Sequence, residues 1–224
     1  NKEGRKKYVV SPEGISVKEL GFYSSKVLSV FDGEKYYLCD INSNIIAGPF
    51  EYLSTINNNI GVIKEGDNWK IINEKGEQIS NQTFSNIVLD SKKIAYRNGL
   101  FAEIGDKYYL INENGEKITE TAYDDAKLFV DGFAAVKSNG KWGFIDKNGN
   151  LVIDFEYHDA QSFSNGFAAV KMNDKWGYIT YSEKDKIDNV AIDYQFEDAV
   201  GFSTTSRVSI VKLNNQWKLL KLYV

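Results

Sequence analysis

The most constraining feature of this sequence is a segment that occurs twice, 34 residues apart. In the first copy, Gly132–Lys137 (Gly-Phe-Ala-Ala-Val-Lys) is followed by Lys141–Asp146 (Lys-Trp-Gly-Phe-Ile-Asp). The second copy repeats both pieces as Gly166–Lys171 and Lys175–Thr180, and 176 − 142 = 34. Self-similarity at a fixed period of this length is typical of repeat architectures, in which each unit buries its apolar face by packing on its neighbours. We therefore expect a repeat array.

Weaker copies extend the array when the tryptophan of each copy is used as an anchor. An aromatic residue that follows a turn and precedes apolar residues recurs at spacings of 33, 39, 34, 34 and 41 residues. The six anchors are Tyr36, Trp69, Tyr108, Trp142, Trp176 and Trp217. We predict one array over residues 1–224, with divergent units over 1–120, two regular units over 121–180 and a divergent last unit over 181–224. The polar stretch Ser182–Asn189 is predicted to be a loop insertion in that last unit.

Each unit is predicted to consist of strands. Apolar and aromatic side chains alternate with period two in Phe133–Ser138 and Trp142–Lys147, as in half-buried strands. Between them, Asn139–Gly140 supplies the positive φ angles of a tight hairpin turn. A second turn, Asp146–Asn150, leads to the short apolar strand Leu151–Ile153. Each unit is therefore expected to be a three-stranded meander with a return segment, to which a fourth strand can be added.

These residues resemble the WG-repeat family of bacterial repeat proteins, whose motif is also written KWG. The matching segments are Lys141–Gly149 and Lys175–Ile179, together with the Gly-Phe-Ala-Ala-Val-Lys segment upstream of each. About residues 123–180 match closely, and the other units match by pattern only, since Lys70 and Lys218 replace the glycine after the tryptophan. The resemblance implies an all-β repeat architecture, frequently in secreted or surface proteins, with no settled activity and no catalytic residues to transfer.

Two arrangements would bury the faces of such units. We expect a closed, β-propeller-like array, because six units fall within the usual range of about four to eight blades. Residues 8–17 look like the latter half of a unit and could complete one split blade with the last strand. An open β-solenoid or curved stack is the alternative, because units of 33 to 41 residues are short for four strands.

The anchors are expected to pack between units. One large aromatic side chain at a fixed place in each unit is what such packing requires, and each ring can bury about 150–250 Å². Gly143 and Gly177, which follow two of the anchors, would let a neighbouring ring or backbone approach closely. The alternative interpretation is that the aromatic side chains form platforms on which sugar rings stack.

The acidic turns invite comparison with calcium sites. Asp40–Asn44, followed by Glu51, has oxygen ligands at the first, third, fifth and twelfth positions of a calcium loop. The sixth position of such a loop is glycine, but here it is Ile45. Asp146–Asn150 has the same first three ligands, with Leu151 at the sixth position. The preference of aspartate and asparagine for turns explains these residues, so no metal site is predicted.

Pairs of acidic residues resemble the carboxylate pairs of glycosidases. However, Asp124–Asp125 and Glu197–Asp198 occupy one repeat position, which His158–Asp159 fills in another unit. Residues adjacent in a strand also point to opposite faces, so a neighbouring pair would not share one substrate. We therefore expect a scaffold role for these pairs and no catalytic residues.

The composition of the chain argues against several kinds of site and partner. A single Cys39 and a single His158 cannot build a cysteine- or histidine-rich metal site, and no cofactor motif is present. The net charge of −4, with 27 basic and 31 acidic residues interspersed, does not favour nucleic acid. No apolar run approaches the roughly 20 residues of a membrane-spanning helix.

The function expected from the sequence is a non-enzymatic binding or scaffold module for a protein or a cell-surface polysaccharide, located outside the cytoplasm. The units that depart from the regular pattern, over residues 1–120 and 181–191, would then carry its specificity. The alternative is an extracytoplasmic glycan-processing enzyme of propeller type, in which two acids and a tyrosine from different units would converge.

Overall fold

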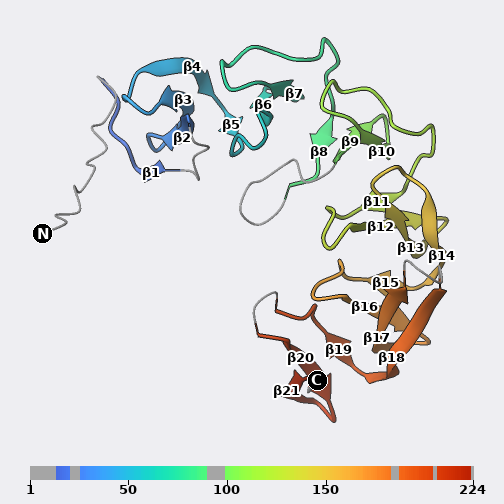
Figure 1. Cartoon of the computed structure of the whole chain (residues 1–224). Coiled ribbons are helices and arrows are strands. Elements are labelled where there is room, and N and C mark those ends of the chain that lie inside the picture. Colours follow the sequence, from blue (N-terminus) through green and yellow to red (C-terminus); the bar gives the residue numbers. More distant parts are fainter. Residues whose placement is uncertain (1–13, 21–25, 90–98, 183–186, 204–205, 223–224) are drawn as a thin grey trace, which may run out of the picture. The chain divides into compact units, whose positions relative to one another are not determined.

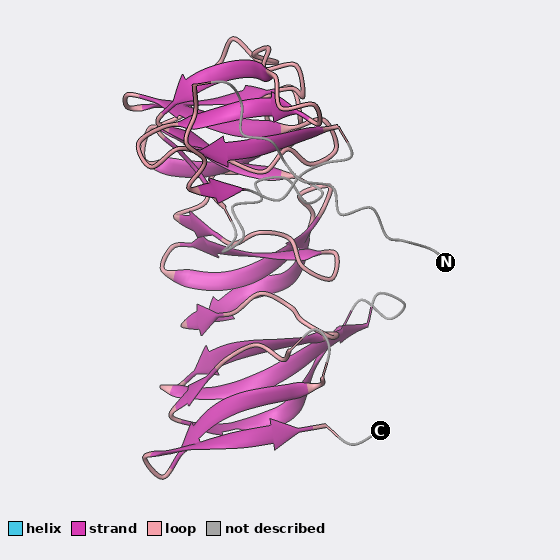
Figure 2. Ribbon diagram, turned by 90° about the vertical axis from the view of Figure 1, so that its left-hand side faces the viewer, coloured by secondary structure: helices cyan, strands magenta, loops and turns pink. Residues whose placement is uncertain are grey.

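The chain is all-β in the computed structural model, and no helix occurs among the residues that it describes (Figure 2). Those residues are 14–20, 26–89, 99–182, 187–203 and 206–222. The chain divides into two compact units, which are described separately. The first comprises residues 1–96 and 113–115, and the second comprises residues 97–112 and 116–224. The all-β prediction is confirmed.

The first unit contains strands β1 to β8 (Figure 1). Their bounds are β1 (Glu19–Leu20), β2 (Val27–Phe31), β3 (Tyr36–Asp40), β4 (Ile45–Phe50), β5 (Tyr52–Leu53), β6 (Gly61–Glu65), β7 (Asn68–Ile72) and β8 (Asn86–Ile87). Strands β1 to β4 form one antiparallel sheet in chain order, and β5 to β7 form a second. The two sheets share a core of Val27, Leu38, Phe50, Leu53, Ile56, Ile63 and Ile72.

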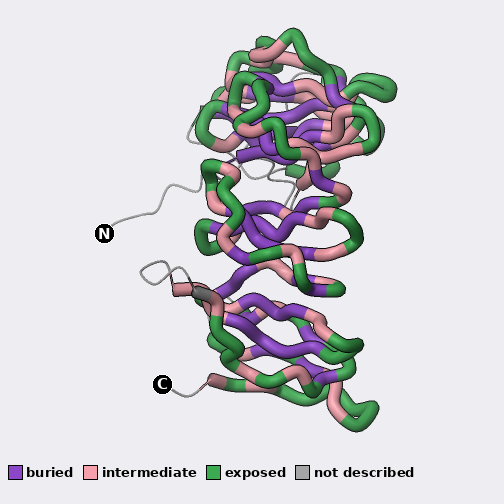
Figure 3. Tube along the Cα trace, turned by 90° about the vertical axis from the view of Figure 1, so that its right-hand side faces the viewer, coloured by how far each residue is buried: buried purple, intermediate pink, exposed green. Residues whose placement is uncertain are grey.

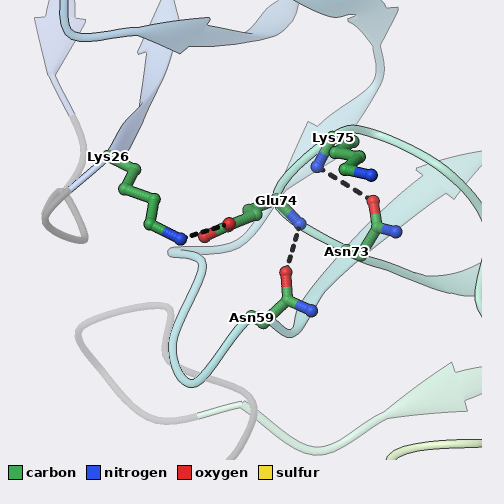
Figure 4. A network of polar contacts seen from close by, with 5 residues as sticks. All are labelled: Lys26, Asn59, Asn73, Glu74 and Lys75. Atoms are coloured by element: carbon green, nitrogen blue, oxygen red, sulfur yellow. Dashed lines mark hydrogen bonds and ion pairs between the residues drawn. The ribbon is translucent and has the colours of Figure 1, made fainter.

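A polar network also joins the two sheets of the first unit (Figure 4). The Lys26 ammonium group, just before β2, lies 2.8 Å from a carboxylate oxygen of Glu74 in the turn after β7. The backbone N–H of Glu74 donates to the side-chain oxygen of Asn59 at 3.0 Å. In the same turn, the N–H of Lys75 donates to Asn73 at 2.9 Å. The turn is thus held from two directions.

The second unit contains strands β9 to β21. Their bounds are β9 (Leu100–Ile104), β10 (Lys107–Ile111), β11 (Asp125–Ala126), β12 (Phe133–Ser138), β13 (Lys141–Asp146), β14 (Leu151–Tyr157), β15 (Asp159–Ala160), β16 (Phe167–Met172), β17 (Lys175–Ser182), β18 (Ile187–Phe196), β19 (Asp198–Ala199), β20 (Val208–Leu213) and β21 (Gln216–Lys221). Strands β9 and β10 form a hairpin. Antiparallel sheets β11–β14, β15–β18 and β19–β21 follow, each in chain order.

The regular repeat has four strands, one more than the predicted meander. The additional strand is the two-residue β11, which pairs with β12 through Asp125 opposite Lys137. The predicted hairpin is confirmed, because Ser138 pairs with Lys141 and leaves a two-residue turn. Its residues Asn139 and Gly140 have φ angles of 49° and 77°.

Consecutive sheets of the second unit pack face to face. The core shared by β11–β14 and β15–β18 contains Phe133, Ala135, Trp142, Phe144, Ile153, Tyr157, Ala160, Phe163, Ala168, Val170 and Ile179. The opposite face of the second of these sheets packs on β19–β21, where Tyr178 and Trp176 meet Phe202 and Val211. In most strands the centres are buried, and the turns are exposed (Figure 3), whereas most of β21 is exposed. The repeats of the second unit therefore bury the faces of their sheets on one another, as the repeats of such an array must.

The predicted loop insertion is wrong at both of its ends, where the residues belong to strands. Ser182 ends β17, and residues 187–189 begin β18, so the two strands extend as a long hairpin. Tyr181 pairs with Asp188, whose carboxylate accepts a hydrogen bond of 2.9 Å from the Tyr157 hydroxyl. These contacts support strand pairing in a polar segment. Residues 183–186 lie outside the described part, as do residues 8–13 of the segment predicted to complete a split blade.

Candidate functional site

The six anchors lie at equivalent places on strands β3, β7, β10, β13, β17 and β21. Five of them are paired across the sheet with another aromatic residue, which comes from the segment that follows. The pairs are Tyr36 with Phe50, Trp69 with Phe84, Tyr108 with Tyr123, Trp142 with Tyr157, and Trp176 with Phe196. Directly opposed side chains have Cβ atoms about 4.5–5.5 Å apart, so each anchor is in reach of a second ring.

The sequence reasoning missed these aromatic partners, although a signal was present. An aromatic residue follows the anchor by 84 − 69 = 15, 123 − 108 = 15 and 157 − 142 = 15 residues in three units. The spacing is 50 − 36 = 14 in the first unit of the array and 196 − 176 = 20 where β17 and β18 are lengthened. The partner could therefore have been predicted from its spacing alone.

Burial separates the last anchor from the others. Trp142 and Trp176 are 4% and 5% exposed, and Tyr36, Trp69 and Tyr108 are half-buried. Trp217 is 57% exposed, so the prediction that it packs between units is wrong for this residue. Among the described residues of the second unit, β21 is the last strand of the sheet β19–β21.

Trp142 packs against the sheet that follows its own. Its ring shares a core with Ala168 of that sheet and with Phe163 in the segment between β15 and β16. The Lys127 ammonium group lies 4.9 Å from the Trp142 ring centroid and donates to the Ala160 carbonyl. Burial lowers the pKa of Lys127, whereas the nearby Asp159 acts in the opposite direction. The anchor thus supports an apolar and a polar contact between two sheets, which is a structural role.

The glycine after the anchor is required by the strand that follows. A Cβ atom added to Gly143 would lie 2.6 Å from the Ile153 carbonyl oxygen, and one added to Gly177 would lie 2.7 Å from that of Ile192. The approach is close because the strand pairing shifts register there: Trp142 pairs with Tyr157, but Phe144 pairs with Ile153. Three residues of β14 therefore pass a single residue of β13, and their backbone bulges against the glycine.

The acidic turns are held by their own hydrogen bonds. One carboxylate oxygen of Asp146 accepts from the backbone N–H groups of Asn148 and Asn150, at 2.8 and 2.9 Å. Asp40 accepts equivalent bonds from Asn42 and Asn44. At the corresponding position, the amide oxygen of Asn73 accepts from Lys75 and Glu77, and that of Asn112 accepts from Glu116. Since an uncharged amide performs the same task, these side chains serve the turn.

The same bonds make the two aspartate turns sensitive to acid. For Asp146, desolvation acts to raise the pKa, but the hydrogen bonds from Asn150, Asn148 and Gly149 outweigh it and lower the pKa. The hydrogen bonds from Asn44 lower the pKa of Asp40. A carboxyl whose pKa is lowered by folding stabilises the fold above its unfolded pKa of about 3.9 and loses that contribution as the pH falls through the folded pKa.

We expect the Asp40→Asn/Asp146→Asn double variant to be less stable than the parent chain at pH 7, because it lacks the contribution of the ionised carboxylates, and to lose less stability below about pH 4. Asparagine keeps the acceptor of the turn but does not titrate. Urea unfolding followed by circular dichroism at pH 7 and pH 3 measures the difference. Equal losses in both proteins would show that other carboxyl groups dominate the acid response.

The paired carboxylates also hold turns. Asp124, Glu197 and Glu51 accept hydrogen bonds from backbone N–H groups of the hairpin turn in their own sheet, donated by Gly140, Asn215 and Gly66 respectively. Asp124 is also 2.6 Å from the Lys107 ammonium group, whose hydrogen bond lowers the pKa of that carboxyl. The second acid of each pair, Asp125, Asp159 or Asp198, accepts from the N–H of the next residue.

The remaining titratable candidates are His158, Cys39 and Tyr157. The ring nitrogen Nε2 of His158 is 2.9 Å from the ammonium group of Lys141. Cys39 is fully buried, and burial raises the pKa of its thiol to about 11. Tyr157, which contacts Asp188, is 1% exposed. Among the residues that the structure describes, no three His, Cys, Asp or Glu side chains lie together as a metal site would require.

A groove of about 670 Å³ lies between the sheets β11–β14 and β15–β18. Its lining consists of Gly132, Phe133, Asp146, Lys147, Asn148, Asn150, Leu151, Val152 and Tyr181. The Phe133 and Tyr181 rings meet edge to face, with centroids 5.2 Å apart. Lys147, Asn148 and Asn150 are exposed on the turn beside them. The groove therefore combines an aromatic and apolar floor with a rim of amide and ammonium donors.

A family model described as the WG-containing repeat matches residues 110–142 and 142–176. Residues 110–176 carry WG repeats. The match confirms the resemblance and covers sheet β11–β14, its anchor Trp142 and Gly143. No curated protein matches the chain in sequence.

Solved structures of other proteins resemble the fold of most of this chain. Hsv2 from Kluyveromyces lactis, a propeller-like protein, is 11% identical over 96% of this chain and 76% of its own, with a TM-score of 0.51. A eukaryotic initiation factor is 11% identical over 88% of this chain and 60% of its own, with a TM-score of 0.53. At such identity the similarity concerns the fold alone. Within the described residues, no helix could cross a membrane.

Proposed function

We propose that this chain is a non-enzymatic binding or scaffold module that recognises a protein or a cell-surface polysaccharide outside the cytoplasm. The observation that carries the proposal is the groove beside Phe133 and Tyr181. Ligand sites are typically concave, with apolar and aromatic walls and a few polar groups that fix orientation. Here sheet β11–β14 and Tyr181 of β17 supply the walls, and the exposed turn after β13 supplies the polar groups.

The hydrogen bonds that the acidic side chains already accept favour a binding role over a glycan-processing role. A general acid or base must reach the proton that it transfers. Asp124, Glu197 and Glu51 instead accept hydrogen bonds from turns of their own sheets. Tyr157, whose hydroxyl donates to Asp188, is buried. Replacing any of these carboxylates should therefore disturb its turn and have no direct effect on a bound ligand.

Replacing Tyr181 with alanine is expected to weaken ligand binding about tenfold, because aromatic residues dominate binding energy in such sites. Panels of soluble polysaccharides and of extracellular protein domains provide the candidate ligands, and titration calorimetry measures affinity. Tyr194→Ala controls for the loss of packing, because Tyr194, like Tyr181, is half-buried against the shared core but does not line the groove. Lys175→Ala, at an exposed position outside the groove, is a second control.

Hydrolysis of any polysaccharide in the panel that is lost in Asp124→Asn or Glu197→Gln would contradict the proposal. It would favour the extracytoplasmic glycan-processing alternative. Binding that Tyr181→Ala and Lys175→Ala leave equally strong would remove the groove as the site.

We also propose that the repeat units close into a propeller-like ring, with an open solenoid as the alternative. The similarity to Hsv2 supports this arrangement. Small-angle scattering discriminates between them, because a ring gives a compact, symmetric distribution of interatomic distances. A long tail in that distribution would favour the open stack.

A further inference from the structure

One position of the repeat gives the groove beside Phe133 and Tyr181 its chemical character. That position lies five residues after the anchor, where the chain leaves the anchor strand in the regular unit. In chain order its occupants are Ile41, Glu74, Glu113, Lys147, Tyr181 and Leu222. Lys147 and Tyr181 both line the groove, although they belong to consecutive units. Residues that differ at one place on a regular scaffold are suited to recognition, so these two side chains indicate what the groove binds.

Tyr181 supplies the accessible aromatic surface of the groove. It lies on the part of β17 that extends beyond the regular repeat, where it pairs with Asp188. Phe133, whose ring meets it at an interplanar angle of 74°, is only 8% exposed, whereas Tyr181 is half-buried. The buried ring thus holds the accessible ring in place. A fixed tyrosine ring offers an apolar face to a flat ligand at a low cost in conformational entropy.

The polar groups that remain available at the rim are mainly donors. Within the described part of the chain, neither the Lys147 nor the Asn148 side chain makes a hydrogen bond or an ion pair. Both carboxylate oxygens of Asp146 are instead used inside the turn. They accept from the backbone N–H groups of Asn148 and Asn150 and from the side-chain amide of Asn150. The unpaired charge among the lining residues is therefore the Lys147 ammonium group, which complements an anion.

The size of the groove favours a narrow ligand over the surface of a folded protein. Its volume of about 670 Å³ lies within the range of small-ligand sites, about 300–1,000 Å³. A standard protein interface instead buries about 800 Å² on each partner and uses about 20–30 residues a side, a far larger set than lines this groove. The groove therefore suits a short stretch of a polymer whose units have apolar faces and polar edges, as sugar rings do.

We propose that the groove binds an anionic polysaccharide: a uronate ring stacks on Tyr181, its carboxylate pairs with Lys147, and one of its hydroxyl groups pairs with the Asn148 amide. The inference rests on the proposed function and selects the polysaccharide from the two classes of partner given there. Lys147 and Asn148 are consecutive residues of one turn, and both line the groove, so they suit two polar groups of a single ring. The charge-assisted hydrogen bonds to the ammonium group would orient the ring on the tyrosine.

Oligosaccharides of polygalacturonate, alginate and hyaluronate are the probes for titration calorimetry with the full chain. Each is compared with its carboxyl-reduced form, which keeps the ring and the linkages but carries no carboxylate. At least one should bind about fivefold more tightly than its reduced form, which is the effect of a good ion pair at a partly exposed site. This preference should shrink when the ionic strength rises from about 0.1 to 1 M, because the Debye length falls from about 10 to 3 Å.

Two lysine variants locate the preference. Lys147→Gln should weaken binding of the charged oligosaccharide about fivefold and leave binding of its reduced form unchanged. Lys75→Gln removes an exposed lysine from the equivalent turn of another unit, and it is the matched control for a general loss of positive charge. It should leave both affinities unchanged.

Three results would overturn the proposal. The first is that none of the three oligosaccharides binds, or that each binds as tightly as its reduced form. The second is a preference that Lys147→Gln and Lys75→Gln reduce equally, which would reflect the charge of the whole chain. The third is binding of an oligoglutamate peptide that Lys147→Gln abolishes, without binding of the sugars, which would assign the groove to a protein segment. Ligand binding that Tyr181→Ala weakens but Lys147→Gln does not would retain the groove of the proposed function and reject only its preference for anions.

Discussion

Replacing Trp142 with alanine should lower the free energy of unfolding by about 3–5 kcal/mol, and Trp176→Ala should cost a similar amount. Each ring is almost completely buried between two sheets, at 4% and 5% exposure. Alanine would leave a cavity that the surrounding strands cannot fill, because both sheets are fixed by their own hydrogen-bonded ladders. The loss of Trp142 would also remove the ring that faces the ammonium group of Lys127.

Trp217→Ala is the matched control for this prediction. It deletes the same side chain from the equivalent place in β21, but the ring is 57% exposed. We expect a change of less than about 1 kcal/mol, as for most surface substitutions. Chemical denaturation of the three variants measures the differences. A similar loss in all three would mean that the tryptophan acts through its strand rather than through packing between sheets.

The second large effect is expected at the glycine of the WG motif. Gly143→Ala and Gly177→Ala should each lower the free energy of unfolding by about 1–3 kcal/mol, as overpacking does. The new methyl group would meet a backbone carbonyl, at 2.6 and 2.7 Å respectively, and a backbone cannot rotate away as a side chain can. Neither glycine has a positive φ angle, so the cost comes from crowding.

Gly201→Ala separates crowding from other effects of removing glycine. A Cβ atom at Gly201 would find its nearest neighbour at 3.8 Å, and this glycine also lacks a positive φ. Its replacement should be neutral or slightly stabilising, since alanine restricts the unfolded chain. If Gly143→Ala proved equally neutral, the register shift between β13 and β14 would have to be adaptable.

The sequence predicts those features of the fold that depend on local residue patterns. Alternation identified the strands, Asn139–Gly140 identified the hairpin, and the repeat identified sheets that pack on one another. A fourth strand was left open, and its position in the two-residue β11 was not predicted because it is too short to show a period. The exposure of Trp217 was missed because its own segment matches the other anchors, and only its neighbours differ.

The groove illustrates a second limit of reading the sequence. Phe133 and Tyr181 are separated by 48 residues (181 − 133) and belong to different repeat units. Their meeting depends on how one sheet lies on the next and on the extension of β17 beyond the regular repeat. The aromatic partners of the anchors were, in contrast, within reach of a search for a constant spacing.

The chain-order pairing of the strands bears on how this protein is made. Sheet β11–β14 is complete within residues 125–157, and sheet β15–β18 within residues 159–196. Contacts between residues close in sequence form quickly, because little loop-closure entropy is lost before they stabilise the chain. Each sheet can thus assemble soon after it leaves the ribosome, without waiting for the carboxyl terminus. Growth during synthesis would proceed sheet by sheet, with each new sheet covering the apolar face left by the one before it.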